Sequence, residues 1–328
     1  MNRTTTPRNM LAVFAIVAVA TAGSPLATSW GAEITTTWMD ATTGNWSSPA
    51  RWDTGVVPNN NMTDTYEVII NADGSYTATL DLNPTINAFT LDAVGATFFA
   101  SQRLLTVIGD TALTEGTVQW RGSTWNGAGT ITNNTLFIAE GNSTVSSVFS
   151  NIDTFRLSSN GTIGESNLTL GPSFTNTGTV VLRNDDAGSG RSVTLAQASG
   201  AFQNNAGGTL TTEQGPGLVG NTRNLTIANL QNAAAANVNI NTDSNFNAVN
   251  GQFNNAGNLN VAGGMRLNFQ NGADLTHTGG TISLANGANI QFNHSGGVYT
   301  QSGGALVMNG AGFVHGDSGA TFTFNGGS

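Results

Sequence analysis

The sequence predicts a β-solenoid, a fold in which short strands stack coil upon coil, and three observations support this prediction. A phrase made of an apolar anchor, a polar Asn/Thr/Gly turn and a second apolar residue recurs in the second half of the chain. The copies at 174 and 202 are 28 residues apart, those at 253 and 275 are 22 apart and those at 275 and 299 are 24 apart, which is typical of one coil of a solenoid. No segment after the first thirty residues carries a 3.6-residue apolar stripe of helical length. The copies begin at Phe174, Phe202, Phe253, Leu275 and Tyr299.

The composition excludes several classes of protein. Of the 328 residues, 38% are hydrophobic, which suffices for a large core, while only 9% are charged. The chain has no Lys and a formal net charge of −9, so it lacks the clustered cations with which proteins bind nucleic acid. It also has no Cys, which rules out disulfides and thiolate metal sites. We expect core packing and stacked backbone hydrogen bonds to hold the fold together, without a cofactor.

Residues 1–32 are predicted to form a signal peptide. A start with two Arg residues precedes an apolar run over residues 10–22, and small residues with candidate cleavage sites between Ala27 and Ala32 follow it. The run is short for a membrane span, which needs about 20 apolar residues; an uncleaved anchor is the alternative. The segment predicts an exported protein, extracellular or on the cell surface (association with the outer membrane included), without direct membrane insertion after cleavage.

Residues 33–65 are predicted to form an N-terminal cap. Trp38, Trp46 and Trp52 lie close together in this segment, among polar turn residues. The first coil of a solenoid would otherwise expose its apolar end, so repeat proteins need an atypical terminal unit. Three Trp side chains are suited to plug that end. The alternative is a carbohydrate platform, because Trp ring faces stack on sugar rings, and it makes the three Trp residues candidate ligand-binding residues.

Residues 66–328 are predicted to form the coils. Short β-rich runs with alternating apolar residues are bounded by Asp, Gly or Asn. The first two runs, at 66–70 and 76–80, are separated by a turn that contains Asp73 and Gly74. An Asp-Gly pair between two such runs predicts a β-hairpin.

Two loops interrupt the repeat, at residues 185–191 and 215–223. In the coils, Val, Ile, Leu and Phe are expected to point inward and Asn and Thr outward. Asn side chains at equivalent turns are expected to form hydrogen-bonded ladders along the axis. Specificity would then lie in the interrupting loops. The repeated phrase stops in mid-pattern at Ser328, which predicts that the chain is part of a longer solenoid.

A spaced pattern of Trp, Gly and Pro opens the mature sequence. It reads Trp38…Gly44-Asn-Trp46…Arg51-Trp52…Gly55-Val-Val-Pro58…Asp64-Thr65…Val68-Ile69. The pattern resembles the opening module of secreted bacterial surface proteins, the large β-helix proteins of autotransporter-passenger or PEP-CTERM type, and the later Phe-x-Asn-x-Gly-Thr-Val phrases resemble their coils. The resemblance covers most of the mature chain and implies a secreted, right-handed parallel β-helix used as a surface scaffold or adhesive stalk. This sequence shows no Val-Pro-Glu-Pro sorting tail, so the resemblance does not extend to the export route.

Three Asp residues are candidate catalytic groups, because parallel β-helices also include polygalacturonases and polysaccharide lyases. Polygalacturonases use Asp residues in Asn-Thr-Asp and Asp-Asp, followed by His-Gly and Arg-x-Lys. This chain has Asp243 in Asn-Thr-Asp, the pair Asp185-Asp186, and His315-Gly316, but the order of the Asp motifs is reversed and Lys is absent. Paired carboxylates do acid and base work when the fold places them about 5–10 Å apart. Solvated turn residues are the favoured interpretation.

Arg183 and Arg191 are further candidate catalytic residues, because a polysaccharide lyase often uses Arg as its base. They flank Asp185 and Asp186, and together the four form the only local cluster of charges. The cluster is a candidate substrate or Ca²⁺ site, but Ca²⁺ takes six to eight oxygen ligands and the Arg side chains oppose it. A surface ion pair is favoured. No metal site is predicted, because isolated, exposed side chains are the simplest interpretation of the His residues, with an array on one face as the alternative. They are His277, His294 and His315.

These features favour a non-enzymatic, adhesin-like scaffold that is exported to the cell surface. Its Asn/Thr-rich faces present spaced amides and hydroxyls, suited to weak multivalent contacts with glycans or neighbouring cell surfaces. The alternative is a carbohydrate-active β-helix enzyme, a polysaccharide lyase or a polygalacturonase-like hydrolase. Convergence of Asp185, Asp186 and Asp243 in a groove would favour the enzyme, whereas an even, charge-poor surface would favour the scaffold. Ice binding by rows of Thr is a remote third option.

Overall fold

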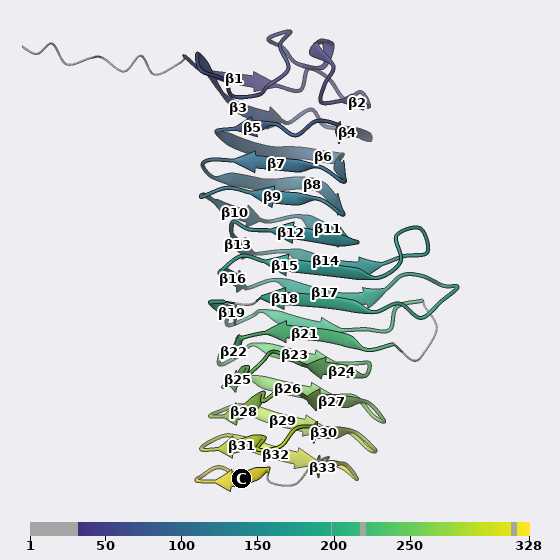
Figure 1. The fold of residues 1–328 in the computed structure, drawn as a ribbon, viewed down its shortest axis with the longest axis vertical. Helices are drawn as coiled ribbons and strands as arrows, with labels where there is room; N and C mark the ends of the chain where they lie inside the picture. Colours follow the sequence, from purple (N-terminus) through teal and green to yellow (C-terminus); the bar gives the residue numbers. More distant parts are fainter. Residues whose placement is uncertain (1–31, 198, 217–220, 316–319) are drawn as a thin grey trace, which may run out of the picture.

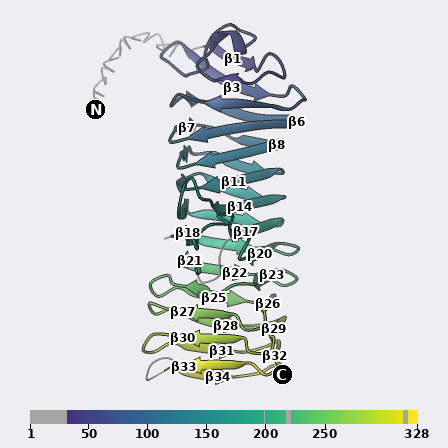
Figure 2. The same ribbon diagram turned by 90° about the vertical axis from the view of Figure 1, so that its right-hand side faces the viewer.

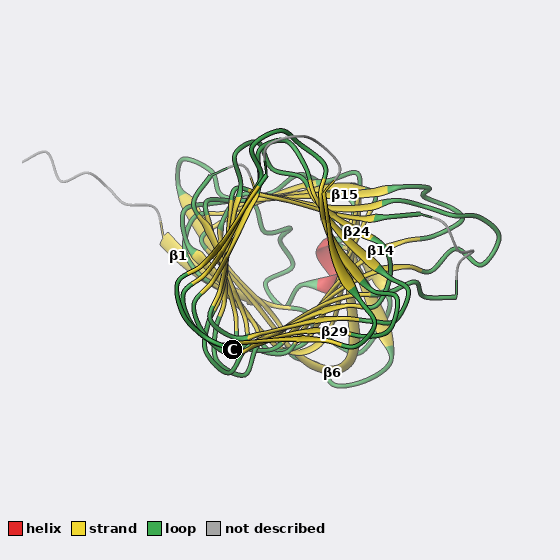
Figure 3. Cartoon of the chain, turned by 90° about the horizontal axis from the view of Figure 1, so that it is seen from below, coloured by secondary structure: helices red, strands yellow, loops and turns green. Residues whose placement is uncertain are grey.

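The chain winds into one column of stacked coils (Figures 1 and 2). The computed structural model describes residues 32–197, 199–216, 221–315 and 320–328, so the predicted signal peptide, residues 1–32, lies outside them except for Ala32. All strand pairing between coils is parallel, and the view along the axis shows three walls of strands (Figure 3). The predicted β-solenoid, a parallel β-helix, is confirmed.

Two of the walls merge into one 23-stranded sheet. Two long strands, β6 (Ala88–Ser101) and β8 (Thr111–Arg121), run through both walls, and the others belong to one wall each. The first face also contains β1 (Ala32–Thr37), β3 (Asp64–Ile70), β10 (Thr130–Asn133), β13 (Val148–Asn151), β16 (Ser173–Asn176), β19 (Ala201–Asn204), β22 (Asn229–Asn232), β25 (Gln252–Asn255), β28 (Asp274–His277), β31 (Val298–Gln301) and β34 (Thr321–Phe324). The second face also contains β2 (Gly44–Asn45), β4 (Tyr76–Leu80), β11 (Leu136–Glu140), β14 (Thr154–Ser159), β17 (Thr179–Asn184), β20 (Thr209–Thr212), β23 (Asn237–Ile240), β26 (Asn258–Val261), β29 (Thr281–Leu284) and β32 (Ala305–Met308).

The third face is a separate 11-stranded sheet. Its strands are β5 (Thr85–Ile86), β7 (Leu104–Val107), β9 (Thr124–Asn126), β12 (Asn142–Val145), β15 (Ser166–Leu170), β18 (Val193–Gln197), β21 (Arg223–Ile227), β24 (Ser244–Phe246), β27 (Arg266–Phe269), β30 (Asn289–Phe292) and β33 (Gly312–His315). Successive side chains of a strand point to opposite sides, so each wall has one buried row and one outward row. The solenoid therefore has three outer surfaces and one continuous core.

Because the strands of consecutive coils pair in register, side chains of the same type stack on one another in the core. Phe149, Phe174 and Phe202, three anchors of the first face, occupy equivalent positions in consecutive coils. Their ring centroids are 5.2 and 4.6 Å apart, and the planes lie within 14° of parallel. The recurring Phe of the sequence phrase is therefore a core column, as the inward assignment of Phe predicts.

The Trp-rich segment closes the N-terminal end of this core. Trp38 and Trp46 pack edge-on against Trp52, with ring centroids 5.0 and 4.8 Å away. The indole N–H of Trp46 donates to the carbonyl oxygen of Pro58 at 3.1 Å, and that of Trp52 donates to the carbonyl of Trp46 at 2.8 Å. Among the described residues the only helix is the 3₁₀ turn η1 (Pro49–Arg51) in this segment. The predicted Trp-rich cap is present.

The predicted hairpin at residues 66–80 is wrong. Strand β3 pairs in parallel with β1 and β6, and β4 pairs in parallel with β2 and β6, so the two strands belong to different faces. The turn between them carries the chain around a corner of the column instead of back on itself. Gly74 has φ +145° there, and its N–H donates to the carbonyl of Val94 in the next coil. An Asp-Gly pair favours a turn but does not fix which strands pair beyond it.

A buried row of Asn side chains runs along the corner after the first face. In each of these coils the Asn lies two residues after the core anchor, so it points to the same side as that anchor. Each Nδ2 donates to the Oδ1 one coil further along, at 2.6–2.8 Å. The expectation of Asn ladders is confirmed, but the assignment of Asn to the outside is wrong for this row. We call it the buried asparagine row: Asn133, Asn151, Asn176, Asn204, Asn232 and Asn255.

His277 ends the buried asparagine row, at 3.0 Å from Asn255, and is fully buried. Burial lowers the pKa of His277 below its ordinary value of 6.5, so below that pH the folded protein binds fewer protons than the unfolded chain. We therefore expect the free energy of unfolding to fall as the pH drops below about 6.5. The substitution His277→Asn, which keeps an amide in the row, is expected to remove this part of the pH dependence. Urea unfolding at pH 7.5 and 5.5 tests this, and an equal loss of stability in both proteins would contradict it.

Candidate functional site

Charged side chains gather along one edge of the solenoid, where the second face turns into the third. They lie on β8, β11, β14 and β17, at the start of β21 and in the loops that follow the second face, of which 160–165 and 185–192 project from the column (Figures 1 and 3). Since only 9% of the chain is charged, this concentration is the main electrostatic feature of the surface. We call it the charged corner: Arg121, Glu140, Arg156, Arg183, Asp185, Asp186, Arg191, Glu213 and Arg223.

Asp185 lies at the centre of an ion-pair cluster in the charged corner. Its carboxylate is 2.5 Å from Nε of Arg183 and 4.0 Å from Nε of Arg156. Arg183 also approaches Glu213 of the next coil at 3.8 Å. The cluster thus links three consecutive coils, β14, β17 and β20. Partly exposed ion pairs of this kind contribute about 0–1 kcal/mol each, so the arrangement fits the favoured prediction of surface ion pairs.

Asp186 holds its own loop in shape. Its carboxylate accepts hydrogen bonds from the hydroxyl of Ser189, from the backbone N–H of Gly188 at 2.9 Å and from Nε of Arg191 at 3.2 Å. The Ser189 hydroxyl, followed by the Gly188 N–H, lowers the pKa of Asp186 below its ordinary value. A general acid needs a raised pKa near the working pH, so Asp186 is set up as an ionised anchor for the loop.

Asp243 belongs to a different ion pair. Its carboxylate accepts hydrogen bonds from the backbone N–H of Arg266 at 2.9 Å and from Nη2 of the same residue at 3.1 Å. It directly precedes β24, which pairs with β21, and β21 pairs with β18 after the loop of Asp186. The structure therefore places Asp185 and Asp186 together but holds Asp243 in a separate pair two coils further along.

Arg223 is one of five members of the charged corner that the sequence did not predict as site residues, the others being Arg121, Glu140, Arg156 and Glu213. The Arg223 side chain is 1% exposed, and its guanidinium donates to four backbone carbonyls at 2.9–3.3 Å. Burial lowers its pKa to about 10, which leaves it protonated at neutral pH. It fastens two neighbouring loops to the column, and its carbonyl partners belong to Arg191, Glu213, Gln214 and Asn221. No sequence pattern could reveal this role of Arg223, because its partners are backbone carbonyls, which every residue has.

The three Trp candidates for ligand binding do not form a platform. Trp38 is 1% exposed, and Trp46 and Trp52 are fully buried. Stacking on a sugar ring needs an open ring face, whereas these faces pack on one another and on Phe89 and Phe98. The three Trp side chains therefore belong to the cap, and the alternative that they form a carbohydrate platform does not hold.

The His residues do not form an array on one face. His277 lies inside the column, so the expectation of an exposed side chain is wrong for it, while Nε2 of His294 lies 2.8 Å from the carbonyl of Ala273 in another corner. The side chain of His315 is outside the described part of the structure. Within that part, no group of three or more His, Asp or Glu side chains is placed to hold a metal ion.

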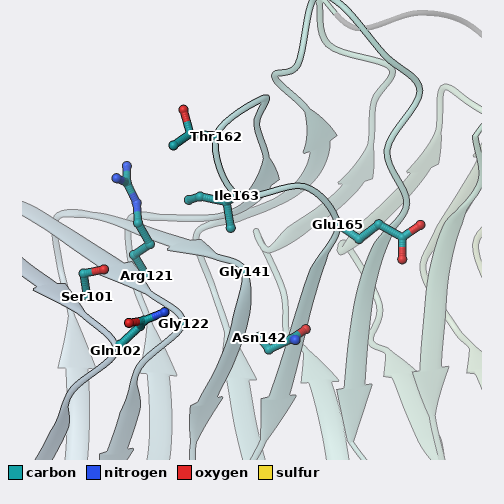
Figure 4. A pocket seen from close by; sticks show the side chains of 9 residues that line it. All are labelled: Ser101, Gln102, Arg121, Gly122, Gly141, Asn142, Thr162, Ile163 and Glu165. Carbon is teal, nitrogen blue, oxygen red and sulfur yellow. The ribbon is translucent and has the colours of Figure 1, made fainter.

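A polar cleft of about 490 Å³ lies under loop 160–165, at the upper end of the charged corner (Figure 4). Glu140 organises its edge, since it accepts hydrogen bonds from Nε of Arg121 at 3.0 Å and from the side-chain amide of Asn160 at the base of the loop. We call it the corner cleft, and it is lined by Ser101, Gln102, Arg121, Gly122, Gly141, Asn142, Thr162, Ile163 and Glu165.

A second amide row runs along the outside of the third face and begins at the corner cleft. Its members occupy equivalent outward positions in consecutive strands, about 4.8 Å apart. Hydrogen bonds join several of them: Asn167 to Asn142 at 2.9 Å, Asn245 to Asn224 at 2.9 Å and Asn268 to Asn245 at 3.1 Å. We call it the outer amide row: Asn142, Asn167, Thr194, Asn224, Asn245, Asn268 and Gln291.

In the described residues no helix is both long enough and apolar enough to cross a membrane. Comparison with known proteins gives no relative for this chain: no family model, no curated protein and no solved structure matches it.

Proposed function

We propose that this β-helix scaffold is an exported, non-enzymatic protein that binds extended neutral glycans through the outer amide row. An Asn side chain offers two N–H groups and two acceptor lone pairs. In the row, Asn224 donates one N–H to Thr194 and accepts one hydrogen bond from Asn245. One donor and one acceptor therefore remain for a ligand. Each Asn of the row uses at most one of its two side-chain N–H groups within the protein, and this line of unused amide donors down the third face is the observation that carries the proposal.

The charge distribution supports neutral glycans over acidic ones. All members of the outer amide row are uncharged, whereas the whole chain has a formal net charge of −9. A polyanionic ligand would be repelled at long range, and a neutral polymer would not. Many weak contacts in a row add up to useful affinity when one polymer engages them together, which suits adhesion to glycans on neighbouring surfaces.

The state of the carboxylates supports a non-enzymatic role. Asp185 is paired with Arg183 and Arg156, Asp186 with Arg191, and Asp243 with Arg266. A glycosidase needs one protonated and one ionised carboxyl group on either side of the bond to be cleaved. The lowered pKa of Asp186 runs against the first of these roles.

We expect the triple substitution of Asn224, Asn245 and Asn268 by Ala to weaken binding to a neutral polysaccharide by about tenfold or more, because each amide contact contributes about 0.5–1.5 kcal/mol. The measurement is cosedimentation of residues 32–328 with insoluble neutral polysaccharides, with assay of the supernatant for released sugars. The matched control replaces three half-buried amides of the second face, namely Asn239, Asn258 and Asn260. Equal losses in both variants would contradict the outer amide row as the binding surface, and released sugars would contradict the non-enzymatic role.

A further inference from the structure

The floor of the corner cleft is made of three stacked turns with left-handed backbone. Gln102, Gly122 and Gly141 have φ +55°, +54° and +64° and follow one another in consecutive coils. The N–H of Gln102 donates to the carbonyl of Arg121, and the N–H of Gly122 to that of Glu140, so the turns are tied together. Two of the three lack a side chain; Ile163 covers Gly141, whereas Gly122 leaves bare backbone at the bottom of the cleft that a ligand can approach closely.

A guanidinium is held in place on one side of the cleft. Arg121 uses Nε and Nη2 to bind Glu140, at 3.0 and 2.9 Å, and its guanidinium lies 5.3 Å from the ring centre of Phe99. These contacts leave Nη1 outside the ion pair. Glu140 is only 7% exposed, whereas the Arg121 side chain is 31% exposed, so a buried carboxylate holds a guanidinium that reaches the surface and fixes the direction of its remaining donor.

The opposite side of the cleft supplies acceptors and an apolar contact. Figure 4 shows Arg121 and Thr162 on one side, and Asn142 and Glu165 on the other. Ile163 lies over the glycine floor, so close that a Cβ on Gly141 would stand 2.8 Å from its Cγ2. The cleft thus combines a charged donor, a charged acceptor, amide and hydroxyl groups and one apolar surface.

We propose that the corner cleft binds one or two units of a neutral saccharide. Sugar hydroxyls both donate and accept, so some accept from the guanidinium of Arg121 while others donate to the side-chain oxygens of Gln102 and Asn142, and the C–H groups of the sugar fit against Ile163. A uronic acid gains Arg121 but meets Glu140 and Glu165, two like charges that disfavour it. The cleft volume of about 490 Å³ lies within the range of small-ligand sites, which is about 300–1,000 Å³.

The cleft and the outer amide row share Asn142. This residue lines the cleft, and its Oδ1 accepts a hydrogen bond from Asn167, the next member of the row. A glycan lying along the third face therefore ends in the cleft, which gives a periodic surface a defined starting point. This step rests on the proposed function, whereas binding of a short saccharide in the cleft does not.

The substitution Gly122→Asn tests the site by filling it. A Cβ at Gly122 would have its nearest neighbour, Gln102 Cγ, at 3.9 Å, and Asn tolerates left-handed backbone. The matched control is Gly264→Asn, at a turn with φ +72° where a Cβ would meet nothing within 4 Å. We expect similar melting temperatures for both variants and, for Gly122→Asn alone, about a tenfold or larger loss of affinity for neutral di- to tetrasaccharides, measured by titration calorimetry beside matched uronate oligomers.

The outcomes separate the two proposals. Loss of short-saccharide binding in Gly122→Asn, with retention in Gly264→Asn, supports the cleft site even if no polysaccharide binds the third face. Binding of long neutral polymers without any binding of short saccharides, or equal affinities in both variants, overturns the cleft site and leaves the proposed function standing. Preference for uronate oligomers overturns the neutral class of ligand.

Discussion

Replacing Trp46 by Ala is expected to lower the free energy of unfolding by about 3–5 kcal/mol, the usual cost of truncating a fully buried aromatic side chain. The ring is 0% exposed and joins the cap to the core, since it packs on Trp52 and lies 6.2 Å from Phe98. The substitution also removes the donor to the carbonyl of Pro58. The cap and the first coils are then expected to open before the rest of the column, because coils of a solenoid contact only their neighbours.

Hydrogen exchange measures this directly. Backbone amides of β3 and β4 are expected to lose protection in Trp46→Ala, while those of β26 and β29 keep it. The control is Met62→Ala in the same segment, whose side chain is 100% exposed and whose removal should change stability by less than about 0.5 kcal/mol. A uniform loss of protection along the whole column would show that the cap acts on global folding and not on one end.

Replacing Asn204 by Ala is expected to destabilise the protein by about 2–4 kcal/mol, through unsatisfied buried polar groups and a cavity. The side chain accepts from Asn176 at 2.7 Å, donates to Asn232 at 2.8 Å and donates to the carbonyl of Asn237 at 2.9 Å. Its loss leaves Oδ1 of Asn232 without that donor inside the column. A single substitution therefore affects three coils.

The matched control is Asn239→Ala, the same change at an outward amide. Asn239 is half-buried and takes part in a surface ladder with Asn260 at 2.9 Å. Water replaces its partners after truncation, so we expect a loss of about 1 kcal/mol or less. Chemical unfolding of both variants decides the matter, and equal losses would mean that the buried row contributes no more than an exposed one.

The core of the solenoid could be predicted from the sequence because it is built from local alternation. The recurring Phe, the short strands and the Trp cap follow from composition and period alone. The inward position of Asn204 could also have been predicted from the sequence, because Asn204 lies two residues after Phe202 and must point to the same side of the strand. Polarity suggested the outside instead, and the hydrogen bonds that satisfy these amides become visible only when the coils are aligned.

The charged corner could not be predicted, because it depends on which residues stack across coils. Members of the buried asparagine row are separated by 18, 25, 28, 28 and 23 residues in turn. Each extra residue goes into a corner loop and shifts every later alignment. Arg156 thus meets Asp185, 29 positions away, while Asp243 is paired elsewhere. The cluster of charges around Asp185 in the sequence indicated where the charged corner lies, but it did not reveal which residues of other coils pair with Asp185.

The buried asparagine row also has a direction. Every Nδ2 from Asn133 to Asn255 donates toward the C-terminus, so the amides form a line of aligned dipoles that polarise one another. At the end of that line, 3.0 Å away, stands Nδ1 of His277. Nδ1 accepts when it faces this amide nitrogen, which only donates, and it donates when it faces the backbone carbonyl of Asn255 at 3.3 Å. The last amide of the row therefore competes with a backbone carbonyl for one imidazole nitrogen, and a proton added to Nδ1 displaces the hydrogen bond from the amide in favour of the one to the carbonyl.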